Sequence, residues 1–315
     1  FPYTTLFRSG VKIDEFRPWI DAVNRETSER FYSRFDDVAA DGKFYWKGHA
    51  PKKLAEGDDP VFRDNEKDTN VACSFISDGI ALIRVNTLNM MRIPGDREVL
   101  FDFYRQYKGC KHLILDFRQN GGGATDYWHK LLVAPTIGKP LRSQNYLTLA
   151  LSQENREFVR CGLNECKEIG APDCRVKPIV EMPQLPRFEK DDLEQLTHFV
   201  DSAYTIDPDA GNHFDCGRIW LLVSSKVYSS SEAFAVFCKN TGYATMVGER
   251  TGGDGLGITP FHAVLPNSGL VIRYSGENGL NHDGSSNAEY CTKPNVVCDS
   301  EDALEACLAE IAKGK

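Results

Sequence analysis

Residues 112–123 read HLILDFRQNGGG, a short apolar run that ends in three consecutive glycines. An apolar run of this length, bounded by turn residues, is typical of a buried strand. Glycine has no Cβ, so it adopts positive φ angles and lets another group approach its backbone closely. We predict a strand over 112–117 and a tight turn at Gly121–Gly123. In one interpretation the glycines only close this turn. In the other they also expose backbone N–H groups, which would stabilise the oxyanion that forms on a substrate during the reaction.

Strand and helix signals alternate on both sides of this segment. The runs 71–75 and 80–85, separated by Ser-Asp-Gly, predict a β-hairpin. Further strands are predicted at 219–223 and 244–247, with a second hairpin at 261–265 and 270–274. Helices are predicted over 97–107, 126–133, 229–240 and 302–312. Strands that alternate with helices in this way indicate an α/β core with crossover connections.

The remaining segments are polar and suggest the domain organisation. Residues 1–9 read FPYTTLFRS, as a common sequencing adapter would encode, and we treat them as an artefact. Residues 10–68 are interpreted as the remnant of an N-terminal module, for which a PDZ-like domain is one option, and a linker. Residues 69–315 form the predicted core, in which about 152–211 is a polar insertion or lid.

Composition excludes several classes of function. The 315 residues include 37 Lys+Arg and 45 Asp+Glu, for a net charge of −8. A nucleic-acid-binding protein needs a basic surface, which this balance disfavours. The longest apolar runs, such as Ile219–Val223, are far shorter than the roughly 20 residues of a membrane helix. We therefore predict neither a nucleic-acid partner nor a membrane span.

The chain has 10 cysteines and no Cys-x-x-Cys pair, so we predict no metal site and no cofactor. Free, packed thiols are expected in the apolar elements, at Cys73, Cys110, Cys238 and Cys307. Disulfide candidates border the polar segment, at Cys161, Cys166, Cys174 and Cys216.

Two further segments contain residues capable of catalysis. Residues 228–232 read YSSSE and precede an apolar helix. Ser229 and Glu232 have the spacing of a capping box. Alternatively, Ser229 is a nucleophile at a strand-to-helix turn, where the positive end of the helix favours an oxyanion. Glu289, in the polar stretch 283–290, is either a solvated carboxylate or a partner of this serine.

Together these segments resemble the carboxyl-terminal processing, or tail-specific, serine peptidase family, especially its tricorn-like branch. The family motif Asp-x-Arg-x-Asn-x-Gly-Gly matches residues 116–123, Ser-x-Ser-Glu matches 229–232, and Gly-Glu-x-Thr-x-Gly matches 248–253. The resemblance covers about residues 70–300. It implies a crotonase/ClpP-like spiral β-β-α core, peptide or protein substrates, and an extracytoplasmic location.

The resemblance also implies roles for individual residues. Ser229 is the expected nucleophile, with the N–H groups of Ser230 and of Gly122 or Gly123 as oxyanion donors. In Ser-Lys members a lysine base follows the serine by about 25 residues, but here that position is Asp254. Tricorn-like members use a histidine steered by a glutamate about 60 residues after the serine, which corresponds to Glu289.

The base histidine is not fixed by the motifs. His49 follows Gly48, as the family base often follows a glycine, and is the candidate in this chain. Otherwise the base precedes the sequence given, and this fragment lacks it. A non-catalytic ligand- or peptide-binding member of the same fold is the alternative function, favoured by Asp254 and the unassigned histidine. Acyl-CoA chemistry on the same fold would leave Ser229 and Glu289 unexplained. Peptide specificity and oligomeric state are not predicted.

Overall fold

The computed structural model describes residues 69–152, 159, 175–188, 195–257, 261–264 and 271–314. Two compact units are distinguished, and the larger comprises 69–151, 163–258 and 277–315. In the smaller unit the described strands are β9 (Phe261–Val264) and β10 (Val271–Tyr274), which pair as the predicted antiparallel hairpin. Residues 1–9, 10–68 and His49 lie outside the described residues, and our division of the chain into domains stays a prediction.

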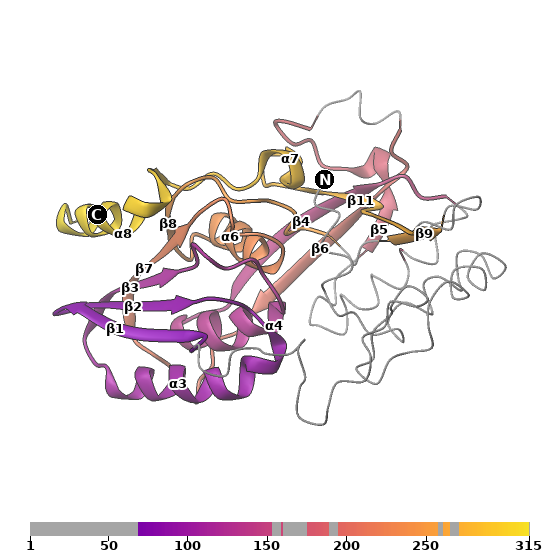
Figure 1. The fold of residues 1–315 in the computed structure, drawn as a ribbon. Coiled ribbons are helices and arrows are strands. Elements are labelled where there is room, and N and C mark those ends of the chain that lie inside the picture. The colour runs from indigo at the N-terminus through magenta and orange to yellow at the C-terminus, as the bar shows by residue number, and fades with distance from the viewer. Residues whose placement is uncertain are drawn as a thin grey trace, which may run out of the picture. The chain divides into compact units, whose positions relative to one another are not determined.

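The larger unit contains a six-stranded mixed sheet (Figure 1). Its strands, in spatial order, are β1 (Val71–Ser77), β2 (Ile80–Val85), β3 (Cys110–Asp116), β7 (Cys216–Val223), β8 (Thr245–Gly248) and β12 (Val296–Val297). The hairpin β1–β2 is antiparallel, and all later neighbours are parallel. The predicted strands are confirmed, and so is the α/β class.

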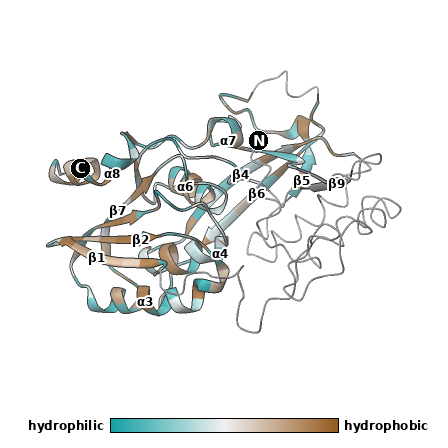
Figure 2. Ribbon diagram, viewed as in Figure 1, coloured by the Kyte–Doolittle hydropathy of each residue, from teal (hydrophilic) through white to brown (hydrophobic). Residues whose placement is uncertain are grey.

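Helices cover both faces of this sheet. They are α3 (Ile93–Gln106), α4 (Thr125–Trp128), α6 (Ser230–Thr241) and α8 (Ala303–Ala312), whereas the short helix α7 (Asn287–Tyr290) contacts the strand β11 (Glu277–Leu280). Leu113 and Leu115 of β3 pack with α3, α4 and α6, whereas Ile114 packs with α8. A strand buried on both faces is apolar throughout, and Figure 2 shows the apolar residues along β2 and β7. α4 runs into a single π-helical turn, His129–Val133, so the helix predicted over 126–133 has two parts.

A second, antiparallel sheet was not predicted. Its order is β11 (Glu277–Leu280), β4 (Leu141–Leu149), β6 (His198–Ile206) and β5 (Arg175–Pro178). β4 escapes the sequence pattern because Ser143 and Asn145 are buried polar residues. Both accept hydrogen bonds from the Asn240 side chain of α6, so polar side chains stand where an apolar alternation would be expected.

The cysteines partly follow the prediction. Cys73, Cys110, Cys238 and Cys307 are free thiols as expected. Cys216 is free as well, so its assignment as a disulfide candidate was wrong: it lies within β7, opposite Cys110 of β3. Cys161, Cys166 and Cys174 lie outside the described residues. Within the described part of the chain, no helix is long and apolar enough to cross a membrane.

Candidate active site

Ser229 lies at the turn between the end of β7 and the start of α6. Its backbone has φ 56° and ψ −126°, and its side chain makes no capping hydrogen bond to the helix. A residue with a Cβ at such a φ costs about 1–3 kcal/mol and persists only where the surroundings impose it. The Glu232 carboxylate does not accept a hydrogen bond from the backbone N–H of Ser229, as a capping box requires, since it binds Asn287 and Thr292. The capping-box interpretation is therefore wrong.

The two serines that follow have their hydroxyls engaged in the interior. Ser230 Oγ accepts a hydrogen bond from Trp128 Nε1 at 3.2 Å. Ser231 Oγ donates to Asn120 Oδ1 at 2.6 Å. Both serines are buried, whereas Ser229 is half-buried. Among the described residues nothing hydrogen-bonds the Ser229 hydroxyl, which makes it the available nucleophile of the three.

The glycine turn lies directly against this serine. A Cβ on Gly122 would lie 2.8 Å from Tyr228 O, 2.9 Å from Ser229 Cβ and 3.1 Å from Ser230 N. Gly122 also has φ 109°, a value that favours glycine. The structure thus brings together the two segments that the sequence analysis singled out, with no side chain between them.

The hydrogen bonds of the turn separate the two candidate oxyanion glycines. Gly122 N donates to Asn120 Oδ1 at 3.0 Å and is occupied. Gly123 and Leu88 form an isolated β-bridge. Its two hydrogen bonds run from Leu88 N to Gly122 O and from Ala124 N to Leu88 O. In the described part of the chain, the N–H groups of Gly123 and Ser230 donate to no acceptor. These two groups are the donors left available in the glycine turn and at the start of α6.

Asn120 is a site residue to which the sequence analysis gave no role. It is fully buried, and its Nδ2 donates to Val85 O at 3.0 Å. Its Oδ1 accepts from both Gly122 N and Ser231 Oγ. One amide therefore connects β2, the glycine turn and α6. The only feature of the sequence that could have indicated this role is the position of Asn120 in the motif 116–123.

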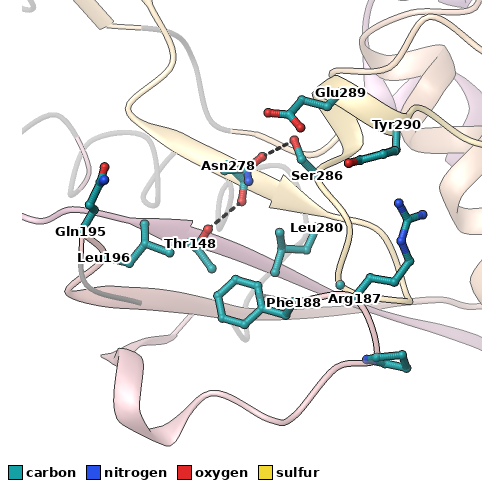
Figure 3. A pocket seen from close by; sticks show the side chains of 12 residues that line it. Thr148, Arg187, Phe188, Gln195, Leu196, Asn278, Leu280, Ser286, Glu289 and Tyr290 are labelled. Atoms are coloured by element: carbon teal, nitrogen blue, oxygen red, sulfur yellow. Dashed lines mark hydrogen bonds between the residues drawn. The ribbon is translucent and has the colours of Figure 1, made fainter. Parts of the chain in front are cut away.

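Glu289 lies on α7, and its side chain is exposed. It lines a pocket of about 510 Å³ together with residues of β4, β11 and the loop that contains Phe188. Figure 3 shows its carboxylate at the edge of this pocket, near Asn278 and Ser286. α7 itself contacts the first turn of α6, because Asn287 Nδ2 donates to Glu232 Oε1 at 2.7 Å. The structure brings the two helices together, but it shows no direct contact between Glu289 and Ser229.

Comparison with known proteins identifies the family. The profile of peptidase family S41 matches residues 79–298, more than half of the chain. The chain belongs to peptidase family S41. This confirms the family resemblance inferred from the three motifs. No curated protein matches the sequence.

Solved structures agree on the fold. A structure from Parabacteroides merdae, named as a peptidase, has 15% identity and a TM-score of 0.51, covering 93% of this chain and 71% of that one. A CPAF point mutant has 16% identity and a TM-score of 0.50, covering 76% of this chain and 51% of that one. Mature CPAF complexed with lactacystin has 16% identity and a TM-score of 0.49, covering 78% and 53%. The S41 chain thus spans about half the length of the CPAF structures it matches.

Asp254 is the residue that the sequence analysis assigned to the lysine position of Ser-Lys members. Asp254 has φ 57° and accepts a hydrogen bond from the hydroxyl of Tyr228, the residue before Ser229. A carboxylate in this position cannot supply a lysine's amine.

Two histidines of the larger unit have other contacts. His112 accepts from Trp220 Nε1 at 3.3 Å, and burial together with Arg218 lowers its pKa. His129 stacks on Tyr204, and burial lowers its pKa to about 4. No hydrogen bond links a histidine to Ser229 or Glu289 within the described residues. Nor do these residues contain a group of three or more potential metal ligands.

Asp116 and Arg118 of the first motif form an ion pair beneath the glycine turn. Arg118 Nη2 lies 2.9 Å from Asp116 Oδ2, and Arg84 Nε lies 3.2 Å from the same oxygen. Arg118 Nη1 also donates to Ser300 O at 2.9 Å. Burial raises the pKa of Asp116, but the two arginines outweigh it, so the pKa lies below the ordinary value. These residues anchor the end of β3.

Replacing Asp116 by asparagine is expected to lower the free energy of unfolding by about 2 kcal/mol at neutral pH, because the buried side chain loses the charge that Arg84 and Arg118 bind. The folded pKa is depressed, so this stabilisation is complete above the ordinary pKa of 3.8 and is lost as the pH falls through the lower native value. Urea unfolding at neutral and acid pH measures it. A difference between wild type and Asp116→Asn that stays constant into acid would contradict the ion-pair explanation.

Proposed function

We propose that this chain carries the catalytic core of a serine endopeptidase with Ser229 as its nucleophile. The observation that carries the proposal is the Ser229 hydroxyl, which is half-buried, free of hydrogen bonds to described residues and held at a positive φ against Gly122. A strained strand-to-helix turn is a recurrent way to present a nucleophile. Membership of a peptidase family supports the same reaction.

In the proposed reaction, Ser229 Oγ attacks the carbonyl carbon of the scissile peptide bond and gives its proton to a histidine base. The carbonyl oxygen becomes an oxyanion, which accepts hydrogen bonds from the N–H groups of Ser230 and Gly123. The amino terminus of α6 adds favourable electrostatic potential. When the intermediate collapses, the C–N bond breaks, and the imidazolium protonates the leaving amine. Water then hydrolyses the acyl-enzyme by the same route.

In this proposal Glu289 steers the base histidine. A carboxylate behind an imidazole fixes its tautomer and stabilises the imidazolium. The contact of α7 with the first turn of α6 supports this role, because it holds the helix that bears Glu289 close to the nucleophile's helix. His49 remains the candidate base. Peptide substrates are proposed to bind as an added strand beside the glycine turn.

A fluorophosphonate probe tests the nucleophile. The full-length protein is incubated with the probe, digested, and mapped by mass spectrometry. We expect one phosphonylated residue, Ser229, and no label in heat-unfolded protein, because the reaction needs the assembled base and oxyanion donors. Label on Ser230 or Ser231 would contradict the assignment.

The alternative is a non-catalytic binding protein on the same fold. The specific observation in its favour is that, among the described residues, no hydrogen bond links a histidine to Ser229 or Glu289. It predicts a folded full-length protein that resists the probe at every serine, yet binds peptides. That outcome would reject the peptidase proposal.

A further inference from the structure

Glu232 is a buried carboxylate to which the proposed reaction assigns no role. It lies in the first turn of α6, three residues after Ser229, and has no solvent exposure. Burial raises its pKa, and nearby donors from Thr251, Thr292 and Asn287 lower it by less. An ionisable group in the interior is costly unless it is hydrogen-bonded, so its contacts indicate what it holds in place.

One oxygen of this carboxylate joins three segments. Oε1 accepts from Asn287 Nδ2 at 2.7 Å and from Thr292 Oγ1 at 2.6 Å. Asn287 is the first residue of α7, and its Oδ1 accepts from Gly255 N at 2.9 Å. Glu232 thereby connects the first turn of α6 to α7 and, through Asn287, to the loop after β8 that contains Gly253 and Gly255.

That loop is closely packed between the two helices. A Cβ on Gly255 would lie 2.3 Å from Ala233 N, and one on Gly253 would lie 2.7 Å from Asn287 O. Ser229 N donates to Gly253 O at 3.4 Å. The loop thus links α7 to the backbone of Ser229.

The helix α7 cannot hold this position by itself. It spans four residues, Asn287–Tyr290, and helices so short are unstable without tertiary contacts. We propose that Glu232 is a positioning residue, which acts through Asn287 to keep α7, and with it Glu289, in register with Ser229. This inference rests on the proposed function, since it assigns Glu289 a part in the reaction.

The opposite end of α6 offers a matched control. Asn240 Nδ2 donates to Ser143 Oγ at 3.1 Å, to Gln144 O at 3.2 Å and to Asn145 Oδ1 at 3.0 Å. These bonds tie α6 to β4 and do not reach α7. Asn240→Ala should lower stability without disturbing the proposed site.

Steady-state peptide hydrolysis by the full-length protein separates positioning from stability. Glu232→Ala is expected to lower kcat by about 100-fold, the scale of a misplaced catalytic group, with KM nearly unchanged. Glu232→Gln keeps an acceptor for Asn287 and Thr292 and should restore most of kcat. Asn240→Ala should keep the wild-type kcat. Loss of kcat in all three variants, or in none, would overturn the proposal.

Alkylation of Cys291 gives a readout that does not need activity. Cys291 directly follows α7, is half-buried, and its Sγ would lie 3.1 Å from a Cβ on Gly253. Mass spectrometry after iodoacetamide treatment should show faster alkylation in Glu232→Ala than in wild type, Glu232→Gln or Asn240→Ala. Equal rates in all four proteins would show that Glu232 does not hold α7. If the wild type proves inactive but the rates differ as expected, only the proposed function fails.

Discussion

Replacing Ser229 by alanine is expected to lower kcat/KM for peptide hydrolysis by about 10⁶-fold, as loss of a serine nucleophile does elsewhere. The neighbouring hydroxyls cannot substitute, because Ser230 Oγ is bonded to Trp128 and Ser231 Oγ to Asn120. Hydrolysis of a fluorogenic peptide by the full-length protein measures the effect, with circular dichroism as the control for folding. Activity within tenfold of wild type would exclude Ser229 as the nucleophile.

A second substitution at this position tests the backbone strain. Ser229→Gly should be as inactive as Ser229→Ala but more stable than it, by about 1 kcal/mol, because glycine adopts positive φ without cost. The serine makes no capping hydrogen bond that either variant would lose. Urea unfolding of both variants measures the difference. Equal stability would mean that the turn relaxes when the hydroxyl is removed.

The central strands β3, β7 and β8 of the six-stranded sheet could be predicted because their apolar runs are buried, whereas the two-residue β12 was not predicted. In β3, Leu113 and Leu115 face one core cluster and Ile114 the other, so the run is apolar throughout. The second sheet could not be predicted in this way. Ser143 and Asn145 of β4 are buried, yet their partner is Asn240, almost 100 residues later in the chain. A pattern of neighbouring residues cannot predict a contact between residues so far apart in the sequence.

The candidate site shows the same limit. Ser229 and Glu232 have the spacing of a capping box, and only the structure rejects it, because Ser229 makes no capping bond and Glu232 binds Asn287 and Thr292. The choice between Gly122 and Gly123 depends on Asn120, whose amide occupies the N–H of Gly122. Both deciding contacts are made by buried polar side chains whose partners the sequence does not indicate.

The close approach of the glycine turn to the nucleophile predicts a large effect for a single methyl group. Gly122→Ala places a Cβ 2.9 Å from Ser229 Cβ and 2.8 Å from Tyr228 O, at φ 109°. Since these neighbours belong to the backbone turn that presents the nucleophile, they must move. We expect a loss of about 3 kcal/mol in unfolding free energy, from overpacking and positive-φ strain. The rate of fluorophosphonate labelling should fall by about 100-fold.

The adjacent Gly121→Ala is the matched control, because a Cβ there meets nothing within 4 Å. It should change stability by no more than about 0.5 kcal/mol, as exposed substitutions usually do, and leave the labelling rate near that of wild type. Stability loss without slower labelling in Gly122→Ala would separate the turn from catalysis. A Gly122→Ala protein indistinguishable from Gly121→Ala would mean that the turn does not lie against Ser229. The oxyanion site proposed at Ser230 and Gly123 would then have no structural basis.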